Sequence, residues 1–258
     1  MNGSIEKAAE TGFRSDFKKV IEINDLRIGF GKQEVLSNVS LQLNNGENLV
    51  VLGKSGSGKS VLIKCIVGLL EPDEGVINVL GENVRSLDRN GLRDLRKKIG
   101  FLFQSGALYD SMTVKENLEF PLRRTGKHFT KEEVDNKIRE SLENVGLIDA
   151  LNKMPSQLSG GMRKRISLAR TLVVDPLIML YDEPTTGLDP VTSDEISALI
   201  NFVQKRYKTS SIIITHDIEC ARATANRIIM IVDGEIYAEG DLEKFEKSED
   251  SVIKSFFK

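Results

Sequence analysis

The feature that most constrains the fold is a short loop rich in glycine and serine. Residues 53–60 read GKSGSGKS, between the apolar stretches ENLVVL and VLIKCIVGLL. A strand before this loop and a helix after it is the context in which the pattern G-x-x-x-x-G-K-[ST] binds phosphate. Backbone N–H groups of such a loop converge on phosphate oxygens at the start of the helix. We therefore expect an α/β fold built around a phosphate-binding loop.

Individual residues of this loop have expected parts in binding a nucleotide. Lys59 would place a positive charge beside the β- and γ-phosphates, and the hydroxyl of Ser60 would ligate Mg²⁺. A simple Gly/Ser turn is the alternative, but the pattern arises by chance in only roughly 1% of chains of this length. Further nucleotide contacts are expected from Gly53, Lys54, Ser55, Gly56, Ser57, Gly58 and Val61.

Composition and charge narrow the class of protein. The 258 residues are 40% hydrophobic, which is enough for a sizeable core. The 36 basic residues nearly balance the 38 acidic ones, so the totals do not point to nucleic acid as a partner. The two cysteines, Cys65 and Cys220, are far apart in a chain with two histidines. This spacing argues against a zinc site and favours free thiols in the cytosol.

The distribution of apolar residues predicts how the chain is organised. No apolar run approaches the roughly 18 residues of a membrane helix, so we expect any membrane role to go through another subunit. Short runs rich in branched residues at 49–52, 178–181 and 212–214 are typical of strands buried on both faces of a parallel sheet. Residues 1–17 are expected to form a polar arm, followed by one domain over residues 18–258.

The stretch from about 105 to 163 interrupts the alternation of strands and helices. Two helical patterns in it begin with the spacing of a capping box, Thr113 with Glu116 and Thr130 with Glu133. No strand-like run separates them. The sequence therefore predicts a helical insertion in the α/β core.

Polar residues at the ends of three predicted strands are candidates for catalysis. In LIMLYDEP, Asp182 would hold Mg²⁺ and Glu183 would accept a proton from an attacking water, unless the two acids only open a loop. Gln104, after IGFLF, would ligate Mg²⁺ or water through its carbonyl oxygen. His216, after SIIIT, would donate a hydrogen bond to a γ-phosphate oxygen. Alone, such a Gln or His is more often structural.

A second glycine-rich loop begins the segment LSGGMRKR at 158–165. Ser159 would donate its hydroxyl to a phosphate, and Gly160 and Gly161 would let the backbone approach it. The helix that follows would point its positive end at the same group. In isolation the alternative is that this stretch is an N-capped helix start with glycine in the preceding turn. Because one loop suffices to hold one nucleotide, the second raises the question of what it binds.

The motifs together resemble the ATP-binding cassette (ABC) ATPases, over residues from about 20 to 241. The first loop, Gln104, LSGGM, LIMLYDEP, TGLDP at 186–190 and His216 occur in the order and at the spacings of that family. The resemblance implies a P-loop NTPase fold with a RecA-like parallel sheet core, an antiparallel β edge and an inserted helical subdomain. It also implies hydrolysis of ATP, with Glu183, His216 and Gln104 as the catalytic residues.

The same resemblance implies a head-to-tail dimer of two copies of this chain. Ser159, Gly160 and Gly161 would then bind the γ-phosphate of the ATP held by the partner copy, so that one two-fold axis creates two identical sites. Asp189 would lie in the loop that passes signals between these sites. Phe30, in GFGKQEV, occupies the position where an aromatic ring stacks on adenine, although on sequence grounds it could equally belong to the core.

Met162 stands where most ABC ATPases have glutamine. The segments LSGGMRKRISLAR and FLFQSGALYDSMTVKENLEFPL are most similar to the ATPases of bacterial Mla/MCE-type lipid transporters. This resemblance implies two copies bound to membrane permease subunits at the cytoplasmic face of the inner membrane. With an MCE-domain protein they would move lipid, phospholipid above all, between the inner membrane and the outer envelope. The alternatives are another import or export system, a soluble ABC ATPase such as the iron–sulfur assembly type, and a regulator without turnover.

Overall fold

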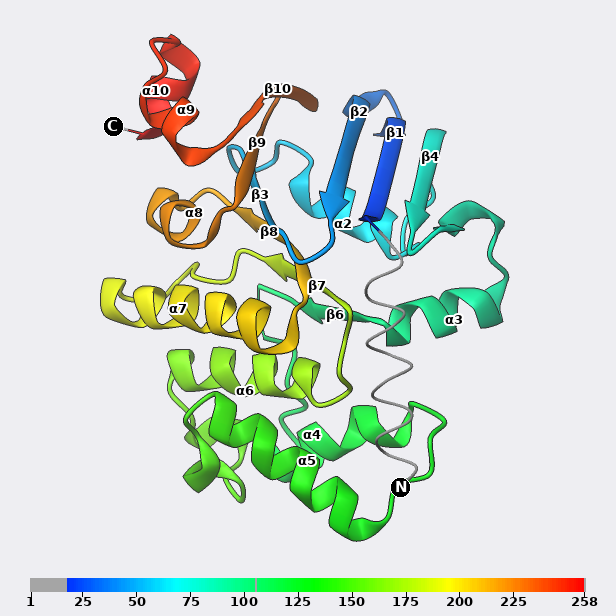
Figure 1. Ribbon diagram of the computed structural model, residues 1–258, viewed down its shortest axis with the longest axis vertical. Coiled ribbons are helices and arrows are strands. Elements are labelled where there is room, and N and C mark those ends of the chain that lie inside the picture. The colour runs from blue at the N-terminus through cyan, green and yellow to red at the C-terminus, as the bar shows by residue number, and fades with distance from the viewer. Residues whose placement is uncertain (1–17, 105, 258) are drawn as a thin grey trace.

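The computed structural model describes residues 18–104 and 106–257, and the predicted arm at 1–17 lies outside the described residues. Two sheets and a set of helices make up this part of the chain (Figure 1). The larger sheet has the strand order β10-β9-β3-β8-β7-β6. Its strands are β3 (Asn48–Leu52), β6 (Ile99–Leu102), β7 (Ile178–Asp182), β8 (Ser210–Thr215), β9 (Arg227–Val232) and β10 (Glu235–Gly240).

The five strands other than β10 run parallel and are mostly buried, as the apolar runs predict. β3 lies between β8 and β9, and every residue of β3 and β8 is buried. Successive side chains of a strand point to opposite faces, so Leu49 and Val51 pack into one hydrophobic core whereas Val50 and Leu52 pack into another. Parallel strands buried on both faces bring the residues that follow β3, β7 and β8 to one edge of the sheet.

The antiparallel part of the fold is larger than the antiparallel β edge that the resemblance implied. β10 pairs antiparallel with β9 at the border of the main sheet. A separate antiparallel sheet has the order β2-β1-β4-β5, and its long strands alternate between buried and exposed residues over much of their length. These strands are β1 (Lys19–Phe30), β2 (Gln33–Asn44), β4 (Glu74–Val79) and β5 (Glu82–Asn83).

Helices pack against the main sheet, and others form the separate segment described below. Those connecting or flanking the strands are α2 (Lys59–Ile66), α3 (Arg89–Lys97), α7 (Pro190–Tyr207), α8 (Ile218–Thr224), α9 (Leu242–Glu246) and α10 (Ser251–Phe257). Short 3₁₀ turns span Val84–Ser86, Ile148–Ala150 and Pro155–Gln157. None of the described helices is both long and apolar enough to cross a membrane.

Between β6 and β7 the chain forms a helical segment that lies at one end of the molecule, away from the antiparallel sheet (Figure 1). It contains α4 (Val114–Arg123), α5 (Lys131–Asn144) and α6 (Gly160–Leu172), and capping boxes start α4 and α5 as the sequence predicts. The segment has a hydrophobic core of its own. α6 belongs to both parts, since Ile166 and Ala169 enter this core while Leu168 packs with the sheet.

Candidate nucleotide-binding site

The first glycine-rich loop lies between β3 and α2, with two of its glycines in the left-handed region. Gly56 has φ +84° and Gly58 has φ +94°. A Cβ on Gly58 would lie 2.5 Å from the Cδ2 atom of Leu36, so packing demands glycine there. At Gly56 no atom lies within 4 Å of such a Cβ. The loop is therefore packed against β2 at one glycine and open at the other, where a phosphate can approach its backbone.

The ammonium group of Lys59 is held inside this loop. Its Nζ atom donates hydrogen bonds to the carbonyl oxygens of Gly53 at 2.8 Å and Lys54 at 2.7 Å. Burial lowers the pKa of Lys59, while the nearby Glu183 and Asp182 carboxylates oppose that shift. The carboxylates therefore favour the charged form that would contact a phosphate.

Ser60 and Asp182 come from different elements and meet beside the loop. The hydroxyl of Ser60, on α2, donates a hydrogen bond of 2.9 Å to Oδ1 of Asp182, at the end of β7. Hydroxyl and carboxylate oxygens suit Mg²⁺, which is commonly held by one or two protein oxygens together with substrate phosphates. The residues present therefore fit a magnesium ion.

Glu183 is fixed by its neighbours in a conformation that costs energy. Its φ is +51°, a region that side-chain-bearing residues rarely adopt. Its carboxylate lies 2.8 and 2.9 Å from Nδ1 of His216, and the hydroxyl of Thr186 donates to Oε2 at 3.0 Å. The Glu183 side chain is 12% exposed, whereas that of His216 is 52% exposed. The Glu183 carboxylate is therefore mostly buried, and the imidazole beside it is open to solvent. The arrangement suits a base that must meet a substrate.

Lys59, Ser60, Glu183 and His216 all line one cavity of about 230 Å³. It is lined by the first loop, by the end of β7 and by the residues after β6 and β8. The structure thus brings together residues from Val35 to His216, which are 181 positions apart in the chain. The lining residues are Val35, Ser55, Gly56, Gly58, Lys59, Ser60, Val61, Gln104, Glu183 and His216.

The residues of the second glycine-rich loop do not line this cavity; they form a separate cluster. Ser159 caps α6 by accepting a hydrogen bond from the Met162 N–H at 3.3 Å, and Ser159 and Gly160 are exposed. A Cβ on Gly161 would lie 2.5 Å from Cγ2 of Thr192, on the helix that Asp189 caps. Hydrogen bonds from Thr192 lower the pKa of Asp189. The second loop and the Asp189 loop therefore lie against each other, apart from the first loop.

Comparison with known proteins decides the family. A sequence profile described as ABC transporter matches residues 36–186, which include the first loop, the second loop and β7. The chain belongs to the ABC transporter family. It carries the ATPase domain of that family, and the P-loop NTPase fold predicted from the sequence is confirmed.

Proteins similar to this chain have different names and come from different organisms. The methionine import ATP-binding protein MetN of Brucella abortus is 38% identical over 87% of this chain, which spans 60% of that protein's length. Protein TRIGALACTOSYLDIACYLGLYCEROL 3, chloroplastic, of Arabidopsis thaliana is 35% identical over 96% of this chain and 76% of that protein. A solved dimeric structure of the ATP-binding cassette MJ0796 in a post-hydrolysis state, bound to ADP and Pi, is 34% identical with a TM-score of 0.79, covering 86% of this chain and 98% of that one.

The structure of this ABC ATPase domain adds residues that no motif marks. Val35 lines the cavity from β2, and Lys164, on α6, donates hydrogen bonds to the carbonyl oxygens of Gln104 and Glu183, which line it. Val35 ends the GFGKQEV segment and lies in β2, and nothing in the sequence placed its side chain at the site. Phe30, predicted to stack on adenine, lies 51% exposed at the end of β1 and is not among the residues that line the cavity.

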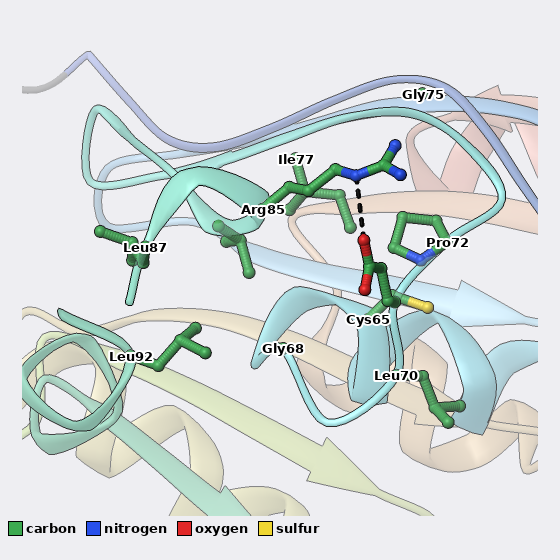
Figure 2. Close-up of a pocket in the computed structure, with 11 residues that line it drawn as sticks. Cys65, Gly68, Leu70, Pro72, Gly75, Ile77, Arg85, Leu87 and Leu92 are labelled. Atoms are coloured by element: carbon green, nitrogen blue, oxygen red, sulfur yellow. Dashed lines mark hydrogen bonds and ion pairs between the residues drawn. The ribbon is translucent and has the colours of Figure 1, made fainter. Parts of the chain in front are cut away.

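A second hollow contains none of the predicted site residues (Figure 2). Its volume is about 160 Å³, and apolar side chains such as Leu70, Ile77 and Leu92 line it. Nε of Arg85 donates a hydrogen bond of 3.0 Å to the Glu71 carboxylate at this hollow (Figure 2). The two hollows share no lining residue, so the predicted chemistry concentrates at the first.

Proposed function

We propose that this chain hydrolyses ATP as the nucleotide-binding subunit of a membrane transporter. The observation that carries the proposal is the convergence of Lys59, Glu183 and His216 on the cavity beside the Ser60–Asp182 pair. A cation, a base and oxygen ligands for Mg²⁺ are the parts that phosphoryl transfer to water requires. Their presence in one place favours an active ATPase over a regulator without turnover.

Each residue has a distinct part in this reaction. Lys59 binds the β- and γ-phosphates, with backbone N–H groups from the rest of the loop. Glu183 takes the proton of the attacking water, and His216 and Thr186 hydrogen-bond to its carboxylate. His216 would also donate a hydrogen bond to a γ-phosphate oxygen, as proposed from the sequence. Ser60, Asp182 and Gln104 would hold Mg²⁺, which when bound neutralises negative charge that develops on the phosphate oxygens. We propose Phe30 as the adenine platform, because its exposed ring is free to stack.

The second glycine-rich loop acts on the nucleotide of a second copy. Ser159, Gly160 and Gly161 are exposed or partly exposed and lie outside their own chain's cavity, so they are available to the partner's γ-phosphate. Asp189 lies against the same cluster and would sense the partner. The dimer of MJ0796 with ADP and Pi supports this arrangement, since that protein resembles this one over 86% of the chain.

We propose lipid, phospholipid above all, as the cargo, carried through a permease and an MCE-domain protein at the cytoplasmic face of the inner membrane. The supporting observations are the LSGGM segment and the segment after Gln104, together with the resemblance to a plant protein whose name contains a lipid and which aligns with 96% of this chain. Methionine import is the second candidate, because MetN of Brucella abortus is 38% identical.

The decisive test of catalysis is Glu183→Gln. Without a general base, hydrolysis should fall by roughly 100-fold or more, while ATP affinity is preserved because Lys59 and the loop are intact. Turnover and binding of a fluorescent ATP analogue should be measured on purified protein. Near-normal turnover would show that Glu183 is not the base.

The cargo is tested with the complex purified from membranes and kept in detergent, so that activity without added phospholipid is the baseline. Phospholipid should stimulate ATP hydrolysis, and methionine should not. Stimulation by methionine alone, with a permease of the import type among the co-purified subunits, would replace the lipid assignment.

A further inference from the structure

Lys164 is a buried charge for which the proposed function gives no role. Among the residues that the structure describes, two lysines are buried, Lys59 and Lys164, and the first belongs to the phosphate loop. Lys164 is 6% exposed and lies on α6, five residues after Ser159. A buried ammonium group is costly unless hydrogen-bonded, so its partners indicate why it is there.

The partners of Lys164 are the main chains of two proposed site residues. Nζ donates hydrogen bonds to the carbonyl oxygens of Gln104, at 2.5 Å, and of Glu183, at 3.4 Å. Burial lowers the pKa of Lys164, and the Asp182 and Glu183 carboxylates oppose that shift. One ammonium group therefore joins α6 to the loops after β6 and β7, which carry the proposed Mg²⁺ ligand and the proposed base.

The contact with Glu183 matters because that residue is strained. At φ +51° its backbone departs from the conformation it would adopt by itself. Its N–H donates to the carbonyl oxygen of Ile214 at 2.9 Å, which fixes one side of the peptide. On the other side, its carbonyl oxygen accepts from the Thr186 N–H and from Lys164, both at 3.4 Å. Lys164 thus helps to hold the backbone that directs the carboxylate toward the cavity.

Further contacts extend this connection along α6. Lys164, Ser167 and Arg170 are three residues apart and share one face of the helix. A Cβ on Gly106 would lie 2.8 Å from Oγ of Ser167, and Arg170 donates to the carbonyl oxygen of Ala107 at 3.0 Å. Three positions on α6 therefore lie against described residues of the loop after β6, at Gln104, Gly106 and Ala107.

We propose that Lys164 is a positioning residue for ATP hydrolysis, which fixes the backbones of Gln104 and Glu183 from the helix that begins at Ser159. This inference rests on the proposed function, because Glu183 and Gln104 must be the groups that act on ATP. The helix that faces the partner's nucleotide would then be fastened directly to the catalytic loops of its own chain.

The test replaces the ammonium group without changing the bulk of the side chain. Lys164→Met removes both hydrogen bonds but keeps a side chain of similar length, and we expect turnover to fall roughly 10- to 100-fold with ATP affinity within about 2-fold of wild type. Lys164→Gln retains N–H donors and should turn over at least several-fold faster than Lys164→Met. Lys137→Met is the matched control, since Lys137 on α5 forms a surface ion pair with Asp175.

A second readout separates positioning from mere loss of structure. With ATP, Lys164→Met should form the nucleotide-bound dimer as Glu183→Gln does, because binding is intact and the reaction is slow. Wild-type turnover in Lys164→Met, equal impairment of the Met and Gln variants, or parallel loss of binding and melting temperature would each overturn the positioning role. Normal turnover in Glu183→Gln, measured alongside, would instead refute the proposed function.

Discussion

The nucleotide cavity at the strand ends and the helical segment between β6 and β7 are packed in different ways. The residues around Lys59 and Glu183 extend from strands buried on both faces, and three elements fix them within one cavity. The helical segment has its own small core, and it presents Ser159 and Gly160 to solvent. The difference indicates that a chain can hold its chemistry on a rigid sheet while it offers a partner a separately packed surface.

Mixed dimers give the largest expected effect and test whether the two regions act in different chains. Pairing one Lys59→Ala chain with one Ser159→Arg chain should leave one composite site damaged twice and the other intact, because Lys59 acts on its own nucleotide and Ser159 on the partner's. Nucleotide binding should survive at one of two sites. It should be measured by titration of tagged, purified heterodimers against each homodimer. If Ser159→Arg abolished binding in isolated monomers as Lys59→Ala does, the second loop would act within its own chain.

The separate core of the helical segment predicts an effect on stability with little effect on the cavity. Leu118, on α4, is fully buried in that core, so Leu118→Ala should lower the free energy of unfolding by about 2–5 kcal/mol. Nucleotide affinity at low temperature should stay near wild type, because no residue of that core lines the cavity. Ile63→Ala is the contrasting variant. Ile63 is buried on α2, the helix after the phosphate loop, so this change should lower both the free energy of unfolding and the nucleotide affinity. Equal losses of affinity in the two variants would show that the regions are not independently packed.

The caps of α4 and α6 give the smallest and sharpest comparison. Thr113 and Glu116 hydrogen-bond reciprocally, whereas Ser159 makes one cap contact of 3.3 Å to a backbone N–H. Thr113→Ala should therefore cost about 1 kcal/mol of stability and leave turnover unchanged. Ser159→Ala should lower stability less than Thr113→Ala does, but it should slow ATP turnover, because the Ser159 hydroxyl is needed at the partner's phosphate. Chemical denaturation and ATPase assays on both variants check this, and the reverse pattern would assign Ser159 to capping alone.

The sequence by itself predicted the parallel sheet, the loop at 53–60 and the helical segment. Each depends on local regularities: apolar runs too short for helices, glycines that permit positive φ, and capping boxes at Thr113 and Thr130. The extent of the antiparallel sheet was not predicted. The pairing of β1 with β2 contains register shifts, which interrupt the strict alternation of apolar and polar residues by which such strands are recognised in a sequence.

Only the tertiary structure decided which residues meet. Asp182 reaches Ser60 across 122 positions, and Val35 enters the cavity from β2, although the motifs assign it no role. Lys164 reads in the sequence as one more basic residue after LSGGM, yet it is buried against the carbonyl oxygens of Gln104 and Glu183. Spacing along a chain records which backbone conformations are allowed, whereas burial and long-range hydrogen bonds depend on how sheets and helices pack. For that reason the motifs located the chemistry, and the fold revealed what holds it in place.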